Sequence, residues 1–197
     1  MSGQRRQQQP AVRRLMREYT EFSKQSPEGF VAAPVGDNIM LWEAYVQGPS
    51  ETVYEGGLFR AELRFPGDYP LSPPTMYFKS EIFHPNIYES GEVCISILHQ
   101  PGEDPNMYED SSERWTPVQS VEKILLSVIS MLSEPNPESG ANIEACKCWR
   151  TNKEEYRKIV RKNIEKSVAE YFSADEKTTA HEHAAGMAEE CAKAVFR

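Results

Sequence analysis

The first regular pattern along the chain is helical. Between residues 11 and 25, large apolar side chains recur at the three- and four-residue spacing that places them on one face of a helix. The apolar positions are Val12, Leu15, Met16, Tyr19 and Phe22. Arg13, Arg14 and Arg17 fall on other faces, where they suit either a solvated surface or the docking of a partner. The pattern predicts a surface helix over residues 11–25, after a flexible N-terminus at residues 1–10.

From Phe30 to Phe78 the pattern changes to period two, which is typical of strands. Turns that contain glycine or proline divide this region, and the sequence predicts three consecutive antiparallel strands near residues 39–47, 51–55 and 58–65. A fourth strand is predicted at residues 75–78. Three prolines before it remove amide donors, so Leu71 is expected in a stiff loop, as a packing contact or a binding contact.

Helical spacing returns after Trp115. The apolar face of this helix consists of Val121, Ile124, Leu125, Val128, Ile129 and Leu132. Thr116 is the predicted N-cap, with Pro117 in the first turn and Gln119 completing a capping box. Further helices are predicted over residues 141–149 and after Asn152, which Glu155 helps to cap. The order of elements predicts an α+β core over residues 11–171 and an extension of ambiguous structure over residues 172–197.

Composition narrows the class of protein. A chain of 197 residues with 39% hydrophobic and 26% charged residues can bury the core of one domain. It contains no apolar run of membrane-spanning length and no N-terminal signal region, so we expect a cytoplasmic protein without direct membrane insertion. A net charge of −8 disfavours nucleic acid as the main partner and favours basic protein surfaces.

The cysteines predict neither disulfides nor a metal site. The four cysteines are Cys94, Cys146, Cys148 and Cys191. Because none of them forms a Cys-x-x-Cys pair, free thiols in a reducing compartment are expected. His181 and His183 lie near Cys191, but their spacing fits no defined zinc site.

Candidate chemistry concentrates between His84 and Trp115. Cys94 stands eight positions after Asn86, and the turn signal Tyr88-Glu89-Ser90-Gly91 lies between them. A thiol performs acyl transfer only where a donor stabilises the oxyanion, and a carboxamide can supply that donor. The local alternation alone favours Cys94 as a small buried apolar residue. The neighbouring His84-Pro85-Asn86 and the polar stretch downstream favour a nucleophile.

Four motifs together resemble the ubiquitin-conjugating enzymes over about residues 11–171. These motifs are Tyr69-Pro70 with Pro73-Pro74, then His84-Pro85-Asn86, then Cys94, then Trp115 with Pro117 before an apolar helix. The resemblance implies the UBC fold, with an N-terminal helix, a four-stranded antiparallel sheet and C-terminal helices. It implies Cys94 as the nucleophile that carries ubiquitin as a thioester and Asn86 as an oxyanion or structural donor.

The same resemblance assigns roles outside the nucleophile. It implies that Arg13, Arg17, Leu71, Pro117 and Val118 contact the RING domain of a ubiquitin ligase. His84 is expected to hold the turn by hydrogen bonds rather than to act as a general base. Many members carry an aspartate in the loop after the helix that follows the tryptophan, whereas this chain has Glu138 there. Either Glu138 or the acidic insertion is expected to replace that aspartate.

The insertion is the chief departure from most of the family. Sixteen residues separate Leu98 from Trp115, where most members have only a few. We expect His99, Glu103 and Asp104 to position an acceptor ubiquitin and to gate Cys94; the alternative is a disordered solvating loop. Carboxylates attract an acceptor lysine but raise its pKa, so they help the reaction only by taking its proton directly.

Within the insertion-bearing subclass, five stretches are similar to the conjugating enzymes of endoplasmic-reticulum-associated degradation. They are Cys94-Ile95-Ser96-Ile97-Leu98-His99, Glu113-Arg114-Trp115, residues 117–126, Glu134-Pro135-Asn136 and Glu138-Ser139-Gly140-Ala141-Asn142. A Cdc-type cell-cycle subclass is the competitor. The resemblance implies ubiquitin, a ubiquitin-activating enzyme, a RING ligase and protein substrates as partners, degradation chains as the product, and recruitment to the reticulum surface by partners. It implies no metal or organic cofactor, because the activating enzyme consumes the ATP.

Two other functions stay open from the sequence. A protein of the same fold can bind ubiquitin as a non-catalytic scaffold, although such a protein is expected to lack the cysteine. An enzyme that conjugates a different ubiquitin-like protein shares the thioester step, so local chemistry does not distinguish it.

Overall fold

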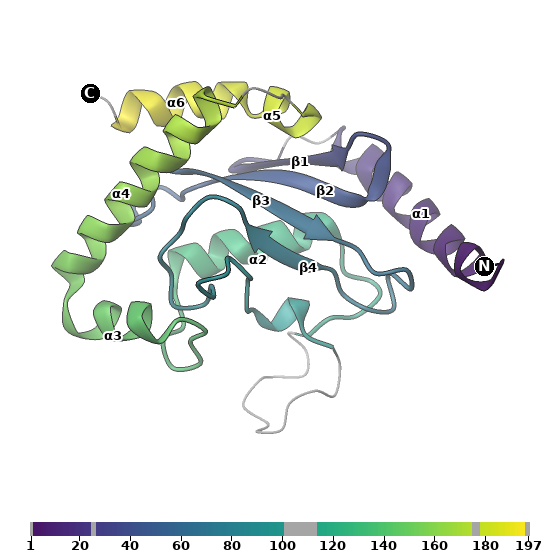
Figure 1. Ribbon diagram of the computed structural model, residues 1–197, viewed down its shortest axis with the longest axis horizontal. Coiled ribbons are helices and arrows are strands. Elements are labelled where there is room, and N and C mark those ends of the chain that lie inside the picture. Colours follow the sequence, from purple (N-terminus) through teal and green to yellow (C-terminus); the bar gives the residue numbers. More distant parts are fainter. Residues whose placement is uncertain (1, 25–26, 101–113, 175–177, 196–197) are drawn as a thin grey trace.

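The structure is a computed structural model that describes residues 2–24, 27–100, 114–174 and 178–195, with only the backbone for residues 2–9. A single antiparallel sheet separates two layers of helices (Figure 1). Its strands follow one another in the order β1 (Phe30–Val35), β2 (Asn38–Gln47), β3 (Leu58–Arg64) and β4 (Thr75–Phe78). An N-terminal helix, this sheet and C-terminal helices confirm the predicted α+β architecture of the UBC fold.

The number of strands was predicted, but one of them was misplaced. Residues 51–55 form turns rather than a strand, with Glu51 in the left-handed region at φ 61°. The first strand is instead β1, whose neighbouring Ala32 and Ala33 are both buried. The alternation that predicts a half-exposed strand is therefore missing from β1. Its Pro34 is tolerated because β1 is an edge strand and the register shifts after Pro34.

The two faces of the sheet belong to different apolar clusters. On β2, Trp42, Ala44 and Val46 pack into the main core, in which the apolar face of α2 (Val121–Ser133) also lies. Tyr45, between two of them, points to the opposite face and joins a second cluster. That outer cluster also receives residues of α4 (Lys153–Phe172). The sheet is thus covered on both sides.

The outer face is covered by the C-terminal extension. Two short helices, α5 (Thr179–His183) and α6 (Ala185–Val195), lie across it beside the end of α4 (Figure 1). Ala180, Ala184 and Ala188 are fully buried there. Cys191 is buried as well and donates to the Gly57 carbonyl at 3.5 Å. Within the described ranges no group of histidine, cysteine and acidic side chains could hold a metal ion.

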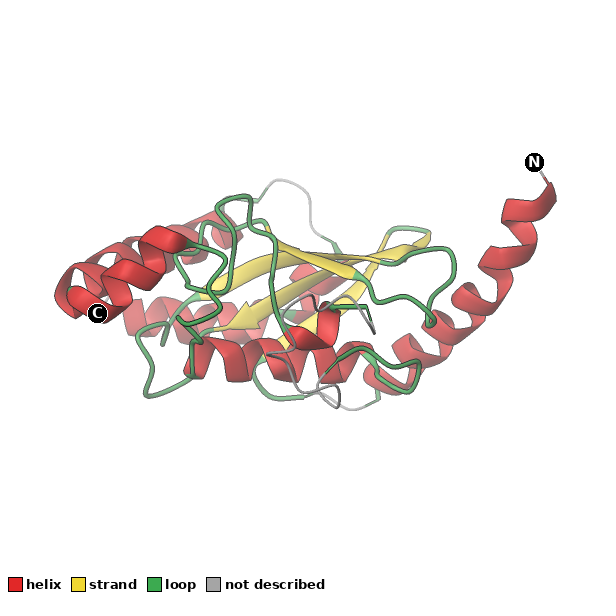
Figure 2. Cartoon of the chain, turned by 90° about the horizontal axis from the view of Figure 1, so that it is seen from below, coloured by secondary structure: helices red, strands yellow, loops and turns green. Residues whose placement is uncertain are grey.

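The helices differ from prediction mainly at their ends. Helix α1 (Ser2–Phe22) begins well before residue 11, and its N-terminal part projects away from the sheet (Figures 1 and 2). Helix α2 is capped by Ser120, which accepts from the Lys123 amide, so the prediction of Thr116 as the cap was wrong. Residues 116–119 form a turn instead.

Two shorter helical elements frame the candidate site. A 3-10 turn, η1 (Ser96–Leu98), begins two residues after Cys94, and α3 (Ile143–Thr151) precedes α4. Asn152 caps α4 by accepting from the Glu155 amide at 3.1 Å, as its sequence context predicted. Among the parts of the chain that the structure describes, no helix is both long enough and apolar enough to span a membrane.

Candidate active site

The histidine before the candidate nucleophile is a structural support. His84 is fully buried, its Nδ1 accepts from the Asn86 amide at 2.9 Å, and its Nε2 lies 3.0 Å from the Met131 carbonyl. Because Nδ1 accepts, Nε2 carries the proton and donates to α2. Burial lowers the pKa of His84 to about 4, against a weaker opposing effect of the Met131 carbonyl. The neutral, buried ring therefore fixes the turn by hydrogen bonds, the role expected for it.

The turn after Asn86 brings Cys94 back beside it. Tyr88 accepts from the Gly91 amide at 2.8 Å, and Gly91 has a φ of 88°, which favours glycine. A Cβ at Gly91 would also lie 2.2 Å from the Phe78 carbonyl oxygen. The Cys94 amide then donates to the Asn86 carbonyl at 3.0 Å. The predicted turn is confirmed, and Asn86 and Cys94 meet through their backbones.

The side chain of Asn86 is bonded elsewhere. Its Nδ2 donates to the Asn136 carbonyl at 2.8 Å and lies 3.5 Å from the Ser139 carbonyl, while its Oδ1 accepts from the Asn136 amide at 2.9 Å. The carboxamide therefore holds the loop between α2 and α3. Of the two roles that the sequence left open for Asn86, the geometry displays the structural one. Donation to an oxyanion would require the amide to give up a loop contact, and that role stays a prediction.

Glu138 stands in the same loop and is largely exposed to solvent. Its side chain is 82% exposed and pairs with Arg150 of α3 at 3.0 Å. The loop returns to the active-site turn at Pro85, whose carbonyl accepts from the Ala141 and Asn142 amides at 2.8 and 3.0 Å. The structure therefore brings the Glu138 loop and the His84-Pro85-Asn86 turn into direct contact.

Two side chains lie close to the Cys94 sulfur. His99 Nε2 is 3.7 Å from Sγ, so this predicted residue is at the candidate nucleophile. Tyr88 is the second, and the sequence indicated it only as part of a turn. The pKa of its phenol is raised, first by the charge of Cys94 and then by a hydrogen bond with Cys94. A tyrosine in a turn that returns to a cysteine was the available signal. Glu103 and Asp104 lie outside the described residues, so their roles stay predictions.

The other three thiols are less suited to acyl transfer. Cys146 and Cys191 are buried, whereas Cys94 and Cys148 are partly exposed. Burial, above all other effects, raises the pKa of each of Cys146, Cys148 and Cys191, that of Cys191 to about 11. A thiol with a raised pKa supplies less of the nucleophilic thiolate near neutral pH.

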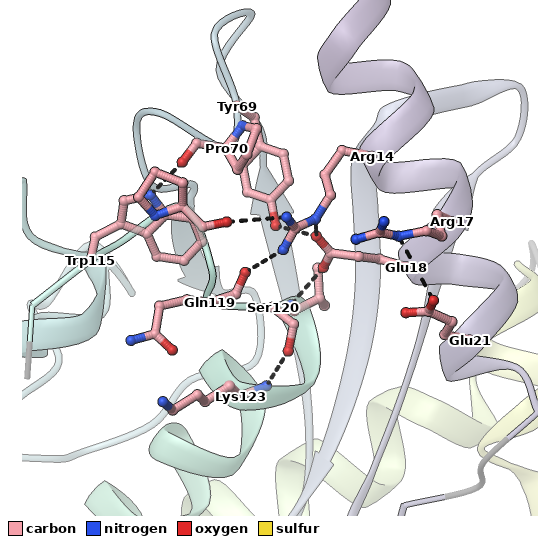
Figure 3. Close-up of polar contacts among 12 residues, drawn as sticks. Arg14, Arg17, Glu18, Glu21, Tyr69, Pro70, Trp115, Gln119, Ser120 and Lys123 are labelled. Atoms are coloured by element: carbon pink, nitrogen blue, oxygen red, sulfur yellow. Dashed lines mark hydrogen bonds and ion pairs between the residues drawn. The ribbon is translucent and has the colours of Figure 1, made fainter.

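A junction of polar contacts joins α1 to the loops before and after the active-site segment (Figure 3). Arg14 donates to the carbonyls of Pro117 at 3.1 Å and Gln119 at 2.7 Å, and pairs with buried Glu18 at 2.5 Å. Glu18 also accepts from the Tyr69 hydroxyl at 2.8 Å and from the Val121 amide, at the start of α2, at 2.8 Å. This buried carboxylate, satisfied by three donors, ties three segments together.

The predicted ligase contacts surround that junction. Trp115 donates to the Pro70 carbonyl at 2.8 Å, which places the loop of Leu71 beside the loop of Pro117 and Val118. Leu71 is 68% and Val118 85% exposed, so neither fills the core. Arg13 is exposed, and exposed Arg17 lies 3.7 Å from Glu21. Arg14, in contrast, bonds to the loops and to Glu18. The helical pattern of the sequence did not distinguish this inward-bonded arginine from the exposed Arg13 and Arg17.

Comparisons with known proteins agree with this geometry. The family model described as "Ubiquitin-conjugating enzyme" matches residues 14–164. "Ubiquitin-conjugating enzyme E2-18 kDa" of Schizosaccharomyces pombe is 60% identical over 159 residues, which cover 80% of this chain and 96% of that protein. "Ubiquitin-conjugating enzyme E2 G2" of Homo sapiens is 58% identical with the same coverage. With the sheet, the turn of Cys94 and these matches in agreement, this chain belongs to the ubiquitin-conjugating enzymes.

Proposed function

We propose that Cys94 is the residue on which this enzyme carries ubiquitin. The observation that carries the proposal is the position of Cys94 itself: it is partly exposed, at the end of a turn fixed by His84 and Gly91. Its thiolate attacks the thioester carbonyl of ubiquitin on the activating enzyme, the new carbon–sulfur bond forms, and the thiolate of the activating enzyme leaves. Exchange between two sulfurs needs no dedicated base.

Transfer to lysine is the harder step. The amine must lose a proton, since the unperturbed lysine pKa is about 10.4, and it must attack while the carbonyl oxygen gains charge. The Cys94 thiolate then leaves and an isopeptide bond remains. We propose that four groups support this step: Tyr88 and His99, which contact the Cys94 thiol, and Asn86 and Glu138, which lie in the active-site turn and in the loop bonded to it.

We further propose that a RING ligase docks on the surface of Leu71, Pro117 and Val118. Its support is the exposure of the apolar Leu71 and Val118 beside the junction that Arg14 and Glu18 bond together. The exposed Arg13 and Arg17 are proposed to add charge contacts at its edge. Assembly of degradation chains, with recruitment to the endoplasmic reticulum by partners, rests on the resemblance of the insertion-bearing motifs.

The test is a charging reaction with activating enzyme, ATP and ubiquitin, resolved on a gel without reductant. We expect one adduct that thiol reagents remove from the parent, and a thiol-resistant adduct or none in Cys94→Ser. Cys148→Ser, which removes the other partly exposed thiol, is the matched control and is expected to charge normally. A thiol-sensitive adduct that persists in Cys94→Ser would refute the assignment. Charging with another ubiquitin-like protein but not with ubiquitin would assign Cys94 to the conjugation of that protein instead.

A further inference from the structure

The loop between α2 and α3 is bonded to the active-site turn through backbone amides at Ala141 and Asn142, but side chains hold its earlier part. Asn86 bonds both the amide and the carbonyl of Asn136. The side chain of Asn136 then accepts from the Glu138 amide at 3.1 Å. These contacts secure the part of the loop that faces the active-site turn. They do not reach the carbonyl of Pro137 or the carboxylate of Glu138.

Arg150 makes those two remaining contacts. It lies in the last turn of α3 and its Nη2 donates to the Pro137 carbonyl at 2.5 Å and pairs with Glu138 at 3.0 Å. The N-terminus of α3 is part of the same arrangement, because its cap, Asn142, also donates its amide to the Pro85 carbonyl. A guanidinium is suited to this task, since its plane holds the two N–H donors of Nη2 in fixed directions toward two acceptors.

The packing between these anchors leaves little space. A Cβ at Gly140 would lie 1.9 Å from the Cys146 sulfur and 3.2 Å from the Pro85 carbonyl oxygen. The loop therefore passes tightly between α3 and the active-site turn at Gly140. A change in the position of residues 137 and 138 is then expected to act on the turn through a well-packed contact.

We propose that Arg150 is a positioning residue for the transfer of ubiquitin to lysine. It fixes the outer part of this loop, and with it the carboxylate of Glu138, as Asn86 fixes the inner part. The proposal rests on the function of Cys94 proposed above. Stability is an insufficient explanation for the contact, because the pair is 46% and 82% exposed and such pairs contribute little to stability.

The first experiment separates charging from transfer. Arg150→Ala is expected to charge at Cys94 within about twofold of the parent rate, and to discharge to free lysine about tenfold more slowly in a single turnover, because misplaced groups beside a reacting centre cost rate. Arg150→Lys keeps the positive charge but loses the fixed directions of the planar N–H donors, and is expected to recover part of the rate. Discharge of Arg150→Ala at the parent rate would overturn the proposal, as would a charging defect of equal size.

Arg161→Ala is the matched control. Arg161 lies on α4, is 78% exposed and pairs with Glu165 at 3.4 Å. The substitution therefore removes a comparable exposed ion pair away from the active-site loop. We expect both its charging and its discharge to equal those of the parent. A slow discharge in this variant would show that loss of any exposed pair has the effect, and would remove the assignment to Arg150.

A double-variant cycle tests the route of the effect. If Arg150 acts by placing Glu138, then Arg150→Ala combined with Glu138→Gln loses less than the product of the two single losses. Independent, fully multiplicative losses would overturn that coupling. Failure of the underlying function is recognised separately: the parent would then form no thiol-sensitive adduct at Cys94, whereas failure of this proposal leaves the adduct intact and the discharge rate of Arg150→Ala unchanged.

Discussion

The active-site loops and the C-terminal extension are both attached to the same sheet, but by different forces. Directional bonds from a few side chains hold the loops around Cys94, with His84 and Asn86 as the central donors and acceptors. The extension buries small side chains and stacks His181 4.0 Å from the ring of Tyr171, and only a few hydrogen bonds, such as those of His181 with Tyr45 and Cys191 with Gly57, accompany this packing. The first arrangement fixes the direction of groups, whereas the second removes surface from water.

The difference predicts different consequences of substitution. The loops lie on the side of the molecule that carries Cys94, while α5 and α6 cover the opposite face of the sheet. Loss of a bond in the loops should therefore slow transfer more than it lowers stability. Loss of a bond under the extension should lower stability and leave transfer unchanged. Each of the following substitutions tests one side of that comparison.

Asn86→Ala is expected to have the largest effect. We expect charging at Cys94 to persist and discharge to lysine to slow roughly a hundredfold, equivalent to on the order of 3 kcal/mol, the typical loss of one oxyanion donor. The structure adds a second route to the same loss, because the variant also releases Asn136. Single-turnover discharge from the charged enzyme measures the effect.

A combined variant distinguishes the two routes. If Asn86 acts only through the loop, then Asn86→Ala together with Arg150→Ala should discharge little more slowly than Asn86→Ala alone. If the amide also serves the oxyanion, the two losses should multiply. Equal discharge rates for Asn86→Ala and the parent would remove Asn86 from the mechanism, and a purely structural residue would show as a lower melting temperature.

The turn at the active site could be predicted because its determinants are close together in sequence. His84, Asn86 and Cys94 lie within one short stretch, and Gly91 stands where the chain needs a positive φ. The contact of Asn86 with Asn136 is not local, however. Sequence spacing suggested that the amide faced the sulfur, and only the packing of α2 and α3 shows that it faces their connecting loop.

Other differences have the same origin. Thr116 and Ser120 are both suitable helix caps by residue type. The helix begins after Ser120, and Arg14 bonds to the turn that lies between the two residues. The first strand lacks the alternation of apolar and polar residues that reveals a strand in the sequence, because both of its faces are covered and neighbouring Ala32 and Ala33 are both buried. The extension gave no clear signal, since its alanines become informative only against the outer face of the sheet.

Acidification tests the support provided by His84. Its pKa is lowered to about 4 in the fold, against an ordinary value of 6.5, so the unfolded chain binds the proton more readily. This contribution to stability is complete above pH 6.5 and is lost as the pH falls toward 4. At pH 5 we expect the loss from this group to be about 2 kcal/mol. Urea unfolding at pH 8 and pH 5 measures it.

His84→Asn provides the comparison for that measurement. Asparagine can accept from the Asn86 amide but does not titrate, so the variant should be less stable at pH 8 and lose less stability at pH 5 than the parent. The same pH dependence in both proteins would assign the acid sensitivity to other groups.

Tyr45→Phe tests the extension and has the smallest expected effect. The Tyr45 hydroxyl lies 3.1 Å from Nδ1 of His181, a buried residue of α5. Its removal is expected to cost about 1 kcal/mol of unfolding free energy, the usual net value of one hydrogen bond, because the ring still fills the same space. Charging and discharge at Cys94 should equal those of the parent, since the bond lies across the sheet from the thiol. Slower discharge in Tyr45→Phe, with normal unfolding, would show that the two faces of the sheet are coupled and that the separation of stability from transfer does not hold.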